Sequence, residues 1–215
     1  MSTGELARAN RYRFDRHRRG YILGRGTLRM LLAQYLEVPA REINFEFGPF
    51  GKPTLANGAE ATHLCFNYSD AGDHALYGFT WNAEIGVDLE NLDRDVNFER
   101  IVQRKFTRAE ASAILGLPAA KRKAAFLACW TRKEGYGKAE GWGIRYSLDS
   151  AEICTDCETD RFDLKAGSDK AKHWIIQQIY PGKRFVGCVV YPSVLEARTD
   201  FALRYFTASP GLPRS

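Results

Sequence analysis

The sequence predicts an α+β fold, because segments typical of strands come first, helical segments follow, and strand-like segments return near the end. Helical periodicity dominates residues 97–140, whereas alternating, β-branched or aromatic segments occupy residues 43–90 and 174–206. A parallel α/β sheet would require strands and helices to alternate one by one. With 215 residues, of which 45% are hydrophobic, the chain can bury a core as one domain or as two small ones.

The N-terminal part of the chain predicts one helix followed by short strands. Residues 22–36 carry leucine and isoleucine at helical spacing, and Pro39 is expected to end this helix. Residues 43–47 alternate apolar and polar side chains, as a half-buried strand does, before the turn-rich stretch 48–53. Further short strands are expected at residues 63–68, 74–80 and 84–90.

The middle of the chain predicts helices and the last third predicts strands. Thr107 and Glu110 have the spacing of a capping box, and Pro118 opens a longer helix that runs towards Gly141. Aromatic and β-branched residues then predict strands at 174–180, 185–191 and 201–206, followed by a frayed tail at 209–215.

The net charge of +5 is concentrated near the N-terminus, where eight arginines within the first thirty residues accompany one glutamate and one aspartate. A local positive field attracts a polyanion, such as nucleic acid, a phosphorylated cofactor or an acidic protein. A solvated basic arm is the alternative interpretation, and charge alone does not decide between them.

The cysteines and the hydropathy pattern predict a soluble, unprocessed cytoplasmic protein. Five cysteines are an odd number and lie in apolar runs, which favours reduced thiols over a disulfide framework. Cys154 and Cys157 form a lone Cys-x-x-Cys pattern without a second metal-ligand pair, so we interpret it as structural. No run of about 18 apolar residues predicts a membrane span, and no membrane association is expected.

Two acidic side chains in an apolar segment are the first chemical signal. Asp88 and Glu90 are two residues apart in the expected strand 84–90, so they lie on the same face. Adjacent carboxylates repel unless a cation compensates them, and a hard divalent ion such as Mg²⁺ is their natural partner. The alternative is an exposed strand end, which Asn91 and Asp93 would favour.

The second signal lies in the expected long helix. Trp130, Glu134 and Lys138 are spaced by four and therefore share one helix face. An exposed Glu–Lys pair at this spacing needs no further role. Gly135 and Gly137, however, each cost a helix roughly 1 kcal/mol relative to alanine, which hints that another element packs close to the backbone there.

These segments and two turn motifs together resemble the 4′-phosphopantetheinyl transferase family, specifically its long, single-chain Sfp-type branch. In chain order the motifs are Gly51-Lys52-Pro53, Phe66-Asn67-Tyr68-Ser69-Asp70, Gly86-Val87-Asp88-Leu89-Glu90, and the helical segment from Trp130 to Gly141. The resemblance extends from the N-terminal helix to about residue 145. It implies two pseudo-symmetric halves, each a small antiparallel sheet with a packed helix, at residues 1–83 and 84–208, with a tail at 209–215. It also implies a monomer.

The resemblance implies transfer of the 4′-phosphopantetheine group from coenzyme A to a serine hydroxyl of an apo acyl or peptidyl carrier protein, with release of 3′,5′-ADP. Asp88, Glu90 and Glu134 match the residues that hold Mg²⁺, with Mn²⁺ as the alternative ion. Glu134 also matches the general base, and Lys138 would stabilise the developing charge. The expected partner is an acidic carrier protein, and no nucleic acid is expected.

The resemblance also implies a set of coenzyme A contacts. The Gly51-Lys52-Pro53 turn would contact the adenine nucleotide end, and an arginine, Arg18 or Arg19, would contact the 3′-phosphate. The full set, with Arg19 taken as that arginine, is Arg19, Gly51, Lys52, Pro53, Ser69, Asp70, Lys133 and Lys138.

The sequence departs from the family pattern at two positions. Asp70 stands where the family has histidine, so we expect weaker coenzyme A binding, which Asp70→His would strengthen. Gly135 replaces the usual alanine, which we expect to loosen the helix without removing a functional group. The rival interpretations are a basic nucleic-acid-binding protein and a family member with impaired activity.

Overall fold

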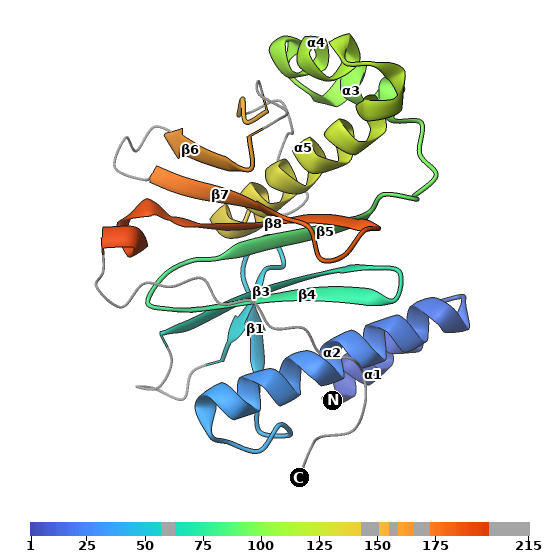
Figure 1. The fold of residues 1–215 in the computed structure, drawn as a ribbon. Coiled ribbons are helices and arrows are strands. Elements are labelled where there is room, and N and C mark those ends of the chain that lie inside the picture. Colours follow the sequence, from blue (N-terminus) through green and yellow to red (C-terminus); the bar gives the residue numbers. More distant parts are fainter. Residues whose placement is uncertain (57–62, 143–150, 155–158, 166–172, 198–215) are drawn as a thin grey trace.

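The computed structural model describes residues 1–56, 63–142, 151–154, 159–165 and 173–197 (Figure 1). Its first half contains α1 (Thr3–Ala9), α2 (Asp15–Leu36), β1 (Phe45–Phe47), β2 (Pro53–Leu55), β3 (Leu64–Ala71) and β4 (His74–Trp81). Its second half contains β5 (Gly86–Asn91), α3 (Phe98–Lys105), α4 (Arg108–Gly116), α5 (Ala119–Glu140), β6 (Arg161–Lys165), β7 (His173–Ile179), β8 (Phe185–Pro192) and a short 3-10 helix, η2 (Ser193–Ala197).

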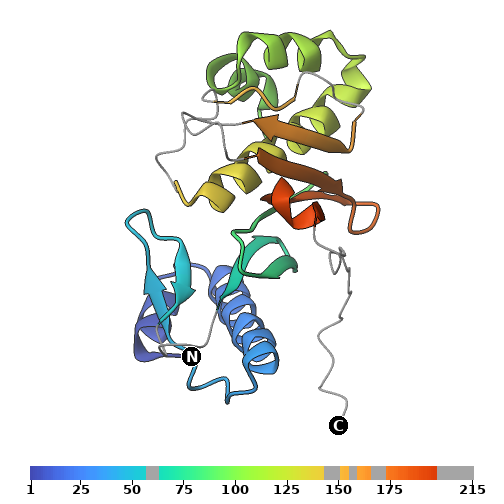
Figure 2. The same ribbon diagram turned by 90° about the vertical axis from the view of Figure 1, so that its left-hand side faces the viewer.

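The strands form antiparallel sheets in both halves, which confirms the predicted α+β architecture. β1 pairs with β2, β3 pairs with β4, and β5-β8-β7-β6 form a four-stranded sheet in that order. Helices α1 and α2 and the β1–β2 hairpin lie below the four-stranded sheet and α3–α5 (Figure 2). The division of the chain near residue 84 stays a prediction.

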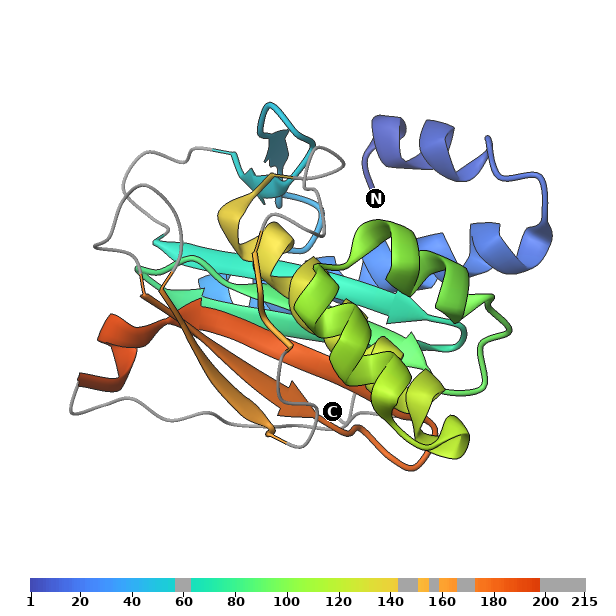
Figure 3. The same cartoon turned by 90° about the horizontal axis from the view of Figure 1, so that it is seen from above.

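Each half buries one amphipathic helix against its strands. In the first half, Leu28 and Leu32 of α2 are fully buried against Ile43, Leu64 and Phe66. In the second half, α5 lies diagonally across the four-stranded sheet and contacts β5 and β8 (Figure 3). Burying a large apolar side chain stabilises a fold by roughly 1.5–3 kcal/mol, so these two interfaces fix each helix on its sheet.

Helix α1 and the start of α2 were not predicted. The hydroxyl of Ser2 accepts a hydrogen bond from the Glu5 N–H (3.3 Å), and the Glu5 carboxylate accepts one from the Ser2 N–H (2.7 Å). This capping box could have revealed α1 from the sequence. Helix α2 begins at Asp15 rather than at residue 22. Apolar periodicity did not reveal its first turns, because their side chains are exposed and mostly polar.

The remaining element predictions agree closely with the structure. The capping box of Thr107 and Glu110 is present in α4, and Pro118 directly precedes α5. Strands β2 and β6 were not predicted, because each is short and lies among turn residues. The strand expected at 201–206, the tail at 209–215 and Cys157 lie outside the described residues.

The basic N-terminal region is only partly a solvated surface. Arg25 and Arg29 are each 3% exposed, and the Arg29 guanidinium donates hydrogen bonds to the Glu5 carboxylate (2.9 Å) and to the Ile43 carbonyl (2.6 Å). A nucleic-acid-binding function would depend on the eight N-terminal arginines. Two of them are therefore buried and cannot contact a phosphate backbone. None of the described helices has the length and apolar character that crossing a membrane requires.

Two glycines allow α5 to lie unusually close to the sheet. A Cβ atom added at Gly86 of β5 would lie 2.0 Å from the Gly135 carbonyl oxygen and 2.6 Å from the Ala139 nitrogen. One added at Gly135 would lie 2.4 Å from the Sγ atom of Cys188 on β8. This confirms the expectation that another element packs close to the helix backbone at Gly135, whose missing side chain makes room for Cys188. The expected loosening of the helix stays a prediction.

Candidate active site

Asp88 of β5 lies where the two halves meet. Its Oδ1 atom accepts hydrogen bonds from the Ser69 hydroxyl of β3 (2.8 Å) and from the Lys138 ammonium of α5 (2.7 Å). The Asp88 side chain is only 8% exposed, and that of Lys138 is 29% exposed. One carboxylate thus joins a strand of the first half to a strand and a helix of the second.

The Phe-Asn-x-Ser segment of β3 explains how the two halves are held in register. The Asn67 side-chain oxygen accepts a hydrogen bond from the Val87 N–H (3.0 Å), one residue before Asp88. Because Asn67 and Ser69 are two apart on one strand, both side chains point to the same face. Asn67 therefore fixes β5 beside β3, and Ser69 then reaches Asp88.

Glu134 lies on the same face of α5 as Lys138 and close to Asp88. Burial is the main cause that raises the pKa of Glu134, and the negative charge of Asp88 raises it further, while Lys138 lowers it. The close approach of α5 at Gly135, whose added Cβ would lie 3.8 Å from the Asp88 nitrogen, produces this proximity. The structure thus brings Asp88, Glu134 and Lys138 together.

Glu90 is paired with Arg94, a residue that sequence analysis missed. The Arg94 guanidinium donates a short hydrogen bond to the Glu90 carboxylate, and the side chains are 44% and 15% exposed. Burial is the largest cause that raises the pKa of Glu90; Arg94 opposes it, and the charge of Asp88 adds to it. Glu90 is therefore electrostatically coupled to Asp88 but is held by a cation of its own.

The three acids have the donor chemistry that a hard divalent cation prefers. Their oxygen atoms are partly desolvated, and the charge of Asp88 raises the pKa values of both Glu90 and Glu134. A divalent cation would relieve that repulsion. Within the described ranges, however, these three acids are not a set whose donor atoms all lie within 4.8 Å of one another; another group of side chains meets that criterion. Sharing one ion would therefore require the carboxylates of Asp88, Glu90 and Glu134 to move closer together.

That other set consists of Glu110, Cys129 and Cys154, and it surrounds Lys133. The Lys133 ammonium lies 2.8 Å from the Glu110 carboxylate, and both side chains are 0% exposed. Glu110 also accepts hydrogen bonds from the N–H groups of Ile153 (2.8 Å) and Cys154 (3.1 Å). The lysine supplies the cation here, so we assign the cluster a structural role.

Lys133 consequently does not reach the group around Asp88. Residues adjacent on a helix do not share a face, and Lys133 points into the core of the second half while Glu134 points towards Asp88. The coenzyme A contact expected of Lys133 is not compatible with this fully buried position.

The Gly51-Lys52-Pro53 turn lies at the C-terminal end of α5. Gly51 has a φ of +84°, the left-handed conformation that glycine adopts without strain. The Lys52 ammonium donates hydrogen bonds to the Ala139 carbonyl (3.0 Å) and to the Glu84 carboxylate. The turn therefore contacts the residue that follows Lys138 on α5. The charge of Lys52, however, is neutralised by Glu84.

A basic cavity of about 700 Å³ lies between α1, α2 and β1. Arg8 and Arg11 contribute its positive charge, whereas Arg29 in its lining is paired with Glu5. Tyr12, Tyr21, Phe45 and Phe47 contribute aromatic walls. Arg18 and Arg19, the expected 3′-phosphate contacts, are exposed on α2 and do not line it. Arg8 and Arg11 belong to the eight arginines of the predicted positive field, but without α1 the sequence did not single them out as coenzyme A contacts.

Tyr68 of β3 lies near this cavity, because the Arg25 guanidinium is 5.5 Å from the centroid of its ring and 5.1 Å from that of Phe45, which lines the cavity. Burial is the largest cause that raises the pKa of Tyr68, and the charge of Arg25 opposes it. Tyr68 directly precedes Ser69, the hydrogen-bond donor to Asp88, but adjacent strand residues point to opposite faces. Asp70 is exposed at the next position of β3. His74, four residues further along, packs against Phe185 with ring centroids 4.0 Å apart and planes tilted by 35°.

Comparison with protein families accounts for both halves of this arrangement. Residues 84–190 match the model of the 4′-phosphopantetheinyl transferase superfamily, and residues 1–78 match the N-terminal domain of 4′-phosphopantetheinyl transferases. The chain belongs to the 4′-phosphopantetheinyl transferase family and is an enzyme of the holo-acyl-carrier-protein synthase type.

Individual relatives place the chain among long members of the family. It is 34% identical to the 4′-phosphopantetheinyl transferase HetI of Nostoc sp. over 189 residues, which cover 88% of this chain and 77% of HetI. It is 24% identical to the Sfp transferase of Bacillus subtilis over 193 residues, 89% of this chain and 82% of Sfp. The human L-aminoadipate-semialdehyde dehydrogenase-phosphopantetheinyl transferase is 28% identical over 157 residues, 69% of this chain and 51% of that protein.

The raised pKa of Glu134 predicts a measurable effect on stability. The native state binds this proton more tightly than the unfolded state, so the resulting stabilisation is complete below the ordinary pKa of 4.5 and is lost as the pH rises through the native pKa. We expect Glu134→Gln to raise the melting temperature of the metal-free protein at pH 7.5, with the gain disappearing near pH 4.5. Calorimetry across this range tests it, with Glu99→Gln on exposed α3 as the control. A lower or unchanged melting temperature at pH 7.5 would contradict it.

Proposed function

We propose that the protein transfers 4′-phosphopantetheine from coenzyme A to a serine hydroxyl of an apo acyl or peptidyl carrier protein and releases 3′,5′-ADP. The observation that carries the proposal is the convergence of Asp88, Glu134 and Lys138 beside Ser69, at the junction of the two halves. Two further features support it: the acidic group has the donor chemistry for a divalent cation, and a basic, aromatic cavity of nucleotide size lies in the first half, between α1, α2 and β1.

Asp88, Glu90 and Glu134 would hold Mg²⁺, or Mn²⁺ as the alternative ion. When bound, this ion supplies charge neutralisation and Lewis-acid polarisation at a pyrophosphate. The residues themselves divide the remaining work. Asp88 is fixed in place by Ser69, and Lys138 is an ammonium that can turn from Asp88 towards a phosphate oxygen.

The proposed reaction needs one base and one stabilising cation. Glu134 takes the proton of the carrier serine as the serine oxygen bonds to the phosphorus that bears pantetheine. The bond from this phosphorus to the bridging oxygen of the pyrophosphate breaks, and 3′,5′-ADP leaves with the electron pair. Lys138, one turn along α5, stabilises the negative charge on the departing phosphate. The raised pKa of Glu134 brings it closer to the working range of a general base.

A mass measurement tests the proposed activity directly. The purified protein is incubated with coenzyme A, MgCl₂ and an apo carrier protein, and the carrier is examined by mass spectrometry. A gain equal to one phosphopantetheine group, absent when chelator replaces MgCl₂, is the expected result. An unmodified carrier across fatty-acid, polyketide and peptide-synthetase types would contradict the proposal, and coenzyme A binding without transfer would indicate an impaired family member.

The basic cavity is the proposed site of the 3′-phosphoadenosine end of coenzyme A. Arg8 and Arg11 offer charge-assisted hydrogen bonds to a 3′-phosphate, and the aromatic walls fit a base. This assignment replaces Arg19, which lies outside the cavity. Asp70, which does not line the cavity, remains a predicted source of weaker binding, because a carboxylate repels a phosphate.

Calorimetric titration with coenzyme A and with dephospho-coenzyme A tests this assignment. Because it removes a cation that faces the 3′-phosphate, Arg8→Ala is expected to weaken coenzyme A binding roughly tenfold, as loss of a hydrogen bond to a charged group does. Dephospho-coenzyme A, which lacks that phosphate, should bind to the variant and the wild type alike. Arg19→Ala provides the matched control on exposed α2. Equal losses for both ligands, or a larger loss from Arg19→Ala, would contradict the assignment.

One copy of the chain supplies every residue of the proposed site, which supports action as a monomer. The exposed arginines of the N-terminal region suit an acidic carrier protein, because opposite charges steer association. The cytoplasmic location expected from the cysteines remains a prediction.

A further inference from the structure

The ion pair between Arg94 and Glu90 has no role in the proposed reaction. Arg94 lies in the turn that follows β5, where its N–H donates a hydrogen bond to the Asn91 carbonyl (3.0 Å). This turn directs its guanidinium back along the strand to the Glu90 carboxylate, four residues earlier. Glu90 is thereby engaged by a cation outside the group formed by Asp88, Glu134 and Lys138.

The carboxylate positions indicate what this pair does. Asp88, Glu90 and Glu134 are coupled through their charges, yet among the described side chains they are not a set whose donor atoms all lie within 4.8 Å of one another. Lys138 compensates Asp88 from within the site, whereas Arg94 compensates Glu90 from its margin. A cation shared by all three acids would require these carboxylates to rearrange, and it would compete with Arg94 for the electron pairs of Glu90.

We propose that Arg94 is a positioning residue that competes with the divalent cation for Glu90 and so sets the affinity of the enzyme for its metal. This inference rests on the proposed function of the three acids. Arg94 is suited to the exchange because its side chain is 44% exposed and lies on a turn, so the released guanidinium enters water rather than the interior. An ion pair whose arginine is 44% exposed and screened by water is weak enough for a divalent cation to displace, although Glu90 itself is only 15% exposed.

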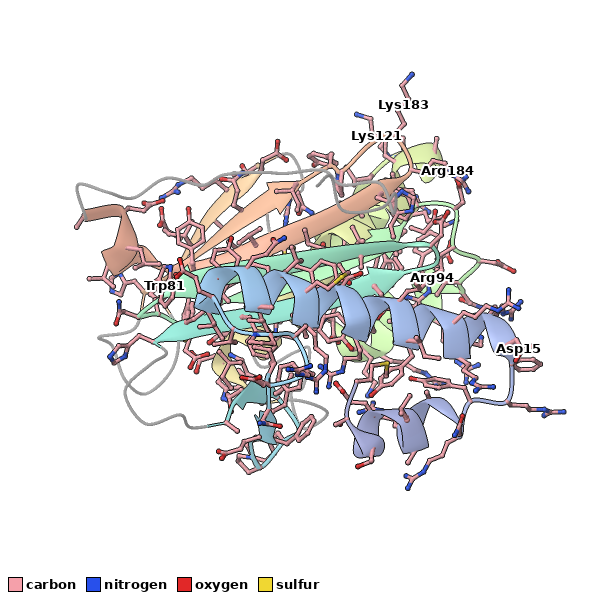
Figure 4. All side chains as sticks on the ribbon, turned by 90° about the horizontal axis from the view of Figure 1, so that it is seen from below. Asp15, Trp81, Arg94, Lys121, Lys183 and Arg184 are labelled. Atoms are coloured by element: carbon pink, nitrogen blue, oxygen red, sulfur yellow. The ribbon has the colours of Figure 1, made fainter. Side chains whose placement is uncertain are left out.

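A matched control lies on the neighbouring turn, between β7 and β8. Arg184 pairs with Asp93, and its carbonyl accepts a hydrogen bond from the Leu92 N–H (2.8 Å). Its side chain is 68% exposed, and Figure 4 shows Arg94 and Arg184 on the same side of the molecule. Arg184→Gln removes the same charge from the same neighbourhood without touching Glu90.

Mn²⁺ binding, followed through the free-ion signal in electron paramagnetic resonance, tests the inference without any carrier or turnover. Wild type, Arg94→Gln and Arg184→Gln are titrated with and without coenzyme A, and circular dichroism verifies that each is folded. Arg94→Gln is expected to bind Mn²⁺ roughly two- to fivefold more tightly, as the loss of a weak competing pair implies. Arg184→Gln should match the wild type.

Two results would overturn the inference while leaving the proposed function intact. In the first, Arg94→Gln binds Mn²⁺ no more tightly than the wild type. In the second, both variants gain affinity equally, which would make the effect one of net charge rather than of Glu90. A third result, no Mn²⁺ binding by any of the proteins, would overturn the proposed metal site and this inference together.

Discussion

Replacing Asp88 with asparagine is expected to lower kcat/KM for carrier modification by roughly 10²- to 10⁴-fold, which corresponds to about 3–5 kcal/mol of transition-state stabilisation. Asparagine keeps the size of the side chain and an oxygen that can accept from Ser69. It loses the negative charge that balances Lys138 and that would bind a divalent cation. The measurement is the rate of carrier modification at several MgCl₂ concentrations, together with the melting temperature.

The matched control is Asp163→Asn on β6, where the carboxylate is 69% exposed and pairs only with Arg161 among the contacts of the described residues. This variant should keep wild-type activity. If Asp88→Asn retained more than about a tenth of the wild-type kcat/KM, the group around Asp88 would not be the site of the chemistry.

Gly86→Ala is expected to have the largest effect on the fold itself. Its new methyl group would lie 2.0 Å from the Gly135 carbonyl oxygen and 2.6 Å from the Ala139 nitrogen, both backbone atoms of α5. A flexible side chain could rotate away from the methyl group, but backbone atoms of a helix cannot move individually. The whole of α5 must therefore shift away from β5. We expect destabilisation of about 3 kcal/mol or more, at the upper end of the range for overpacking.

The same shift should separate Glu134 and Lys138 from Asp88, so activity is expected to fall more steeply than the folded fraction. Urea unfolding and carrier modification are measured on the same preparations. Gly26→Ala in α2 is the control, because a Cβ atom there would meet nothing within 4 Å, and alanine should stabilise the helix by up to about 1 kcal/mol. A Gly86→Ala variant as stable as the wild type would contradict the proposed close packing.

Much of the candidate site follows from spacing along the chain. Asp88 and Glu90 share a strand face because they are two residues apart, and Glu134 and Lys138 share a helix face because they are four apart. The same rule could have shown that Lys133 does not share a face with Glu134. Likewise, Ser2 and Glu5 have the spacing of a capping box, which would have located α1 and the position of Arg8 on it.

Other features depend on elements that are distant in sequence. The pairing of Ser69 with Asp88, and of Asn67 with Val87, requires β3 and β5 to lie side by side, and no local pattern specifies that contact. Gly135 combines both kinds of information. Its low helix propensity indicated that another element packs close to the backbone there, but only the structure identifies that element as the Cys188 side chain of β8.

The sequence by itself determined the α+β class, most of the helices and strands, and the identity of the acids, because periodicity and capping are properties of neighbouring residues. Only the tertiary structure decided which basic side chain neutralises which acid. Lys133 pairs with Glu110, Lys138 with Asp88 and Arg29 with Glu5. Coulombic and hydrogen-bonding partners depend on distance in space, and that distance exists only after the strands have paired and α5 has packed against them.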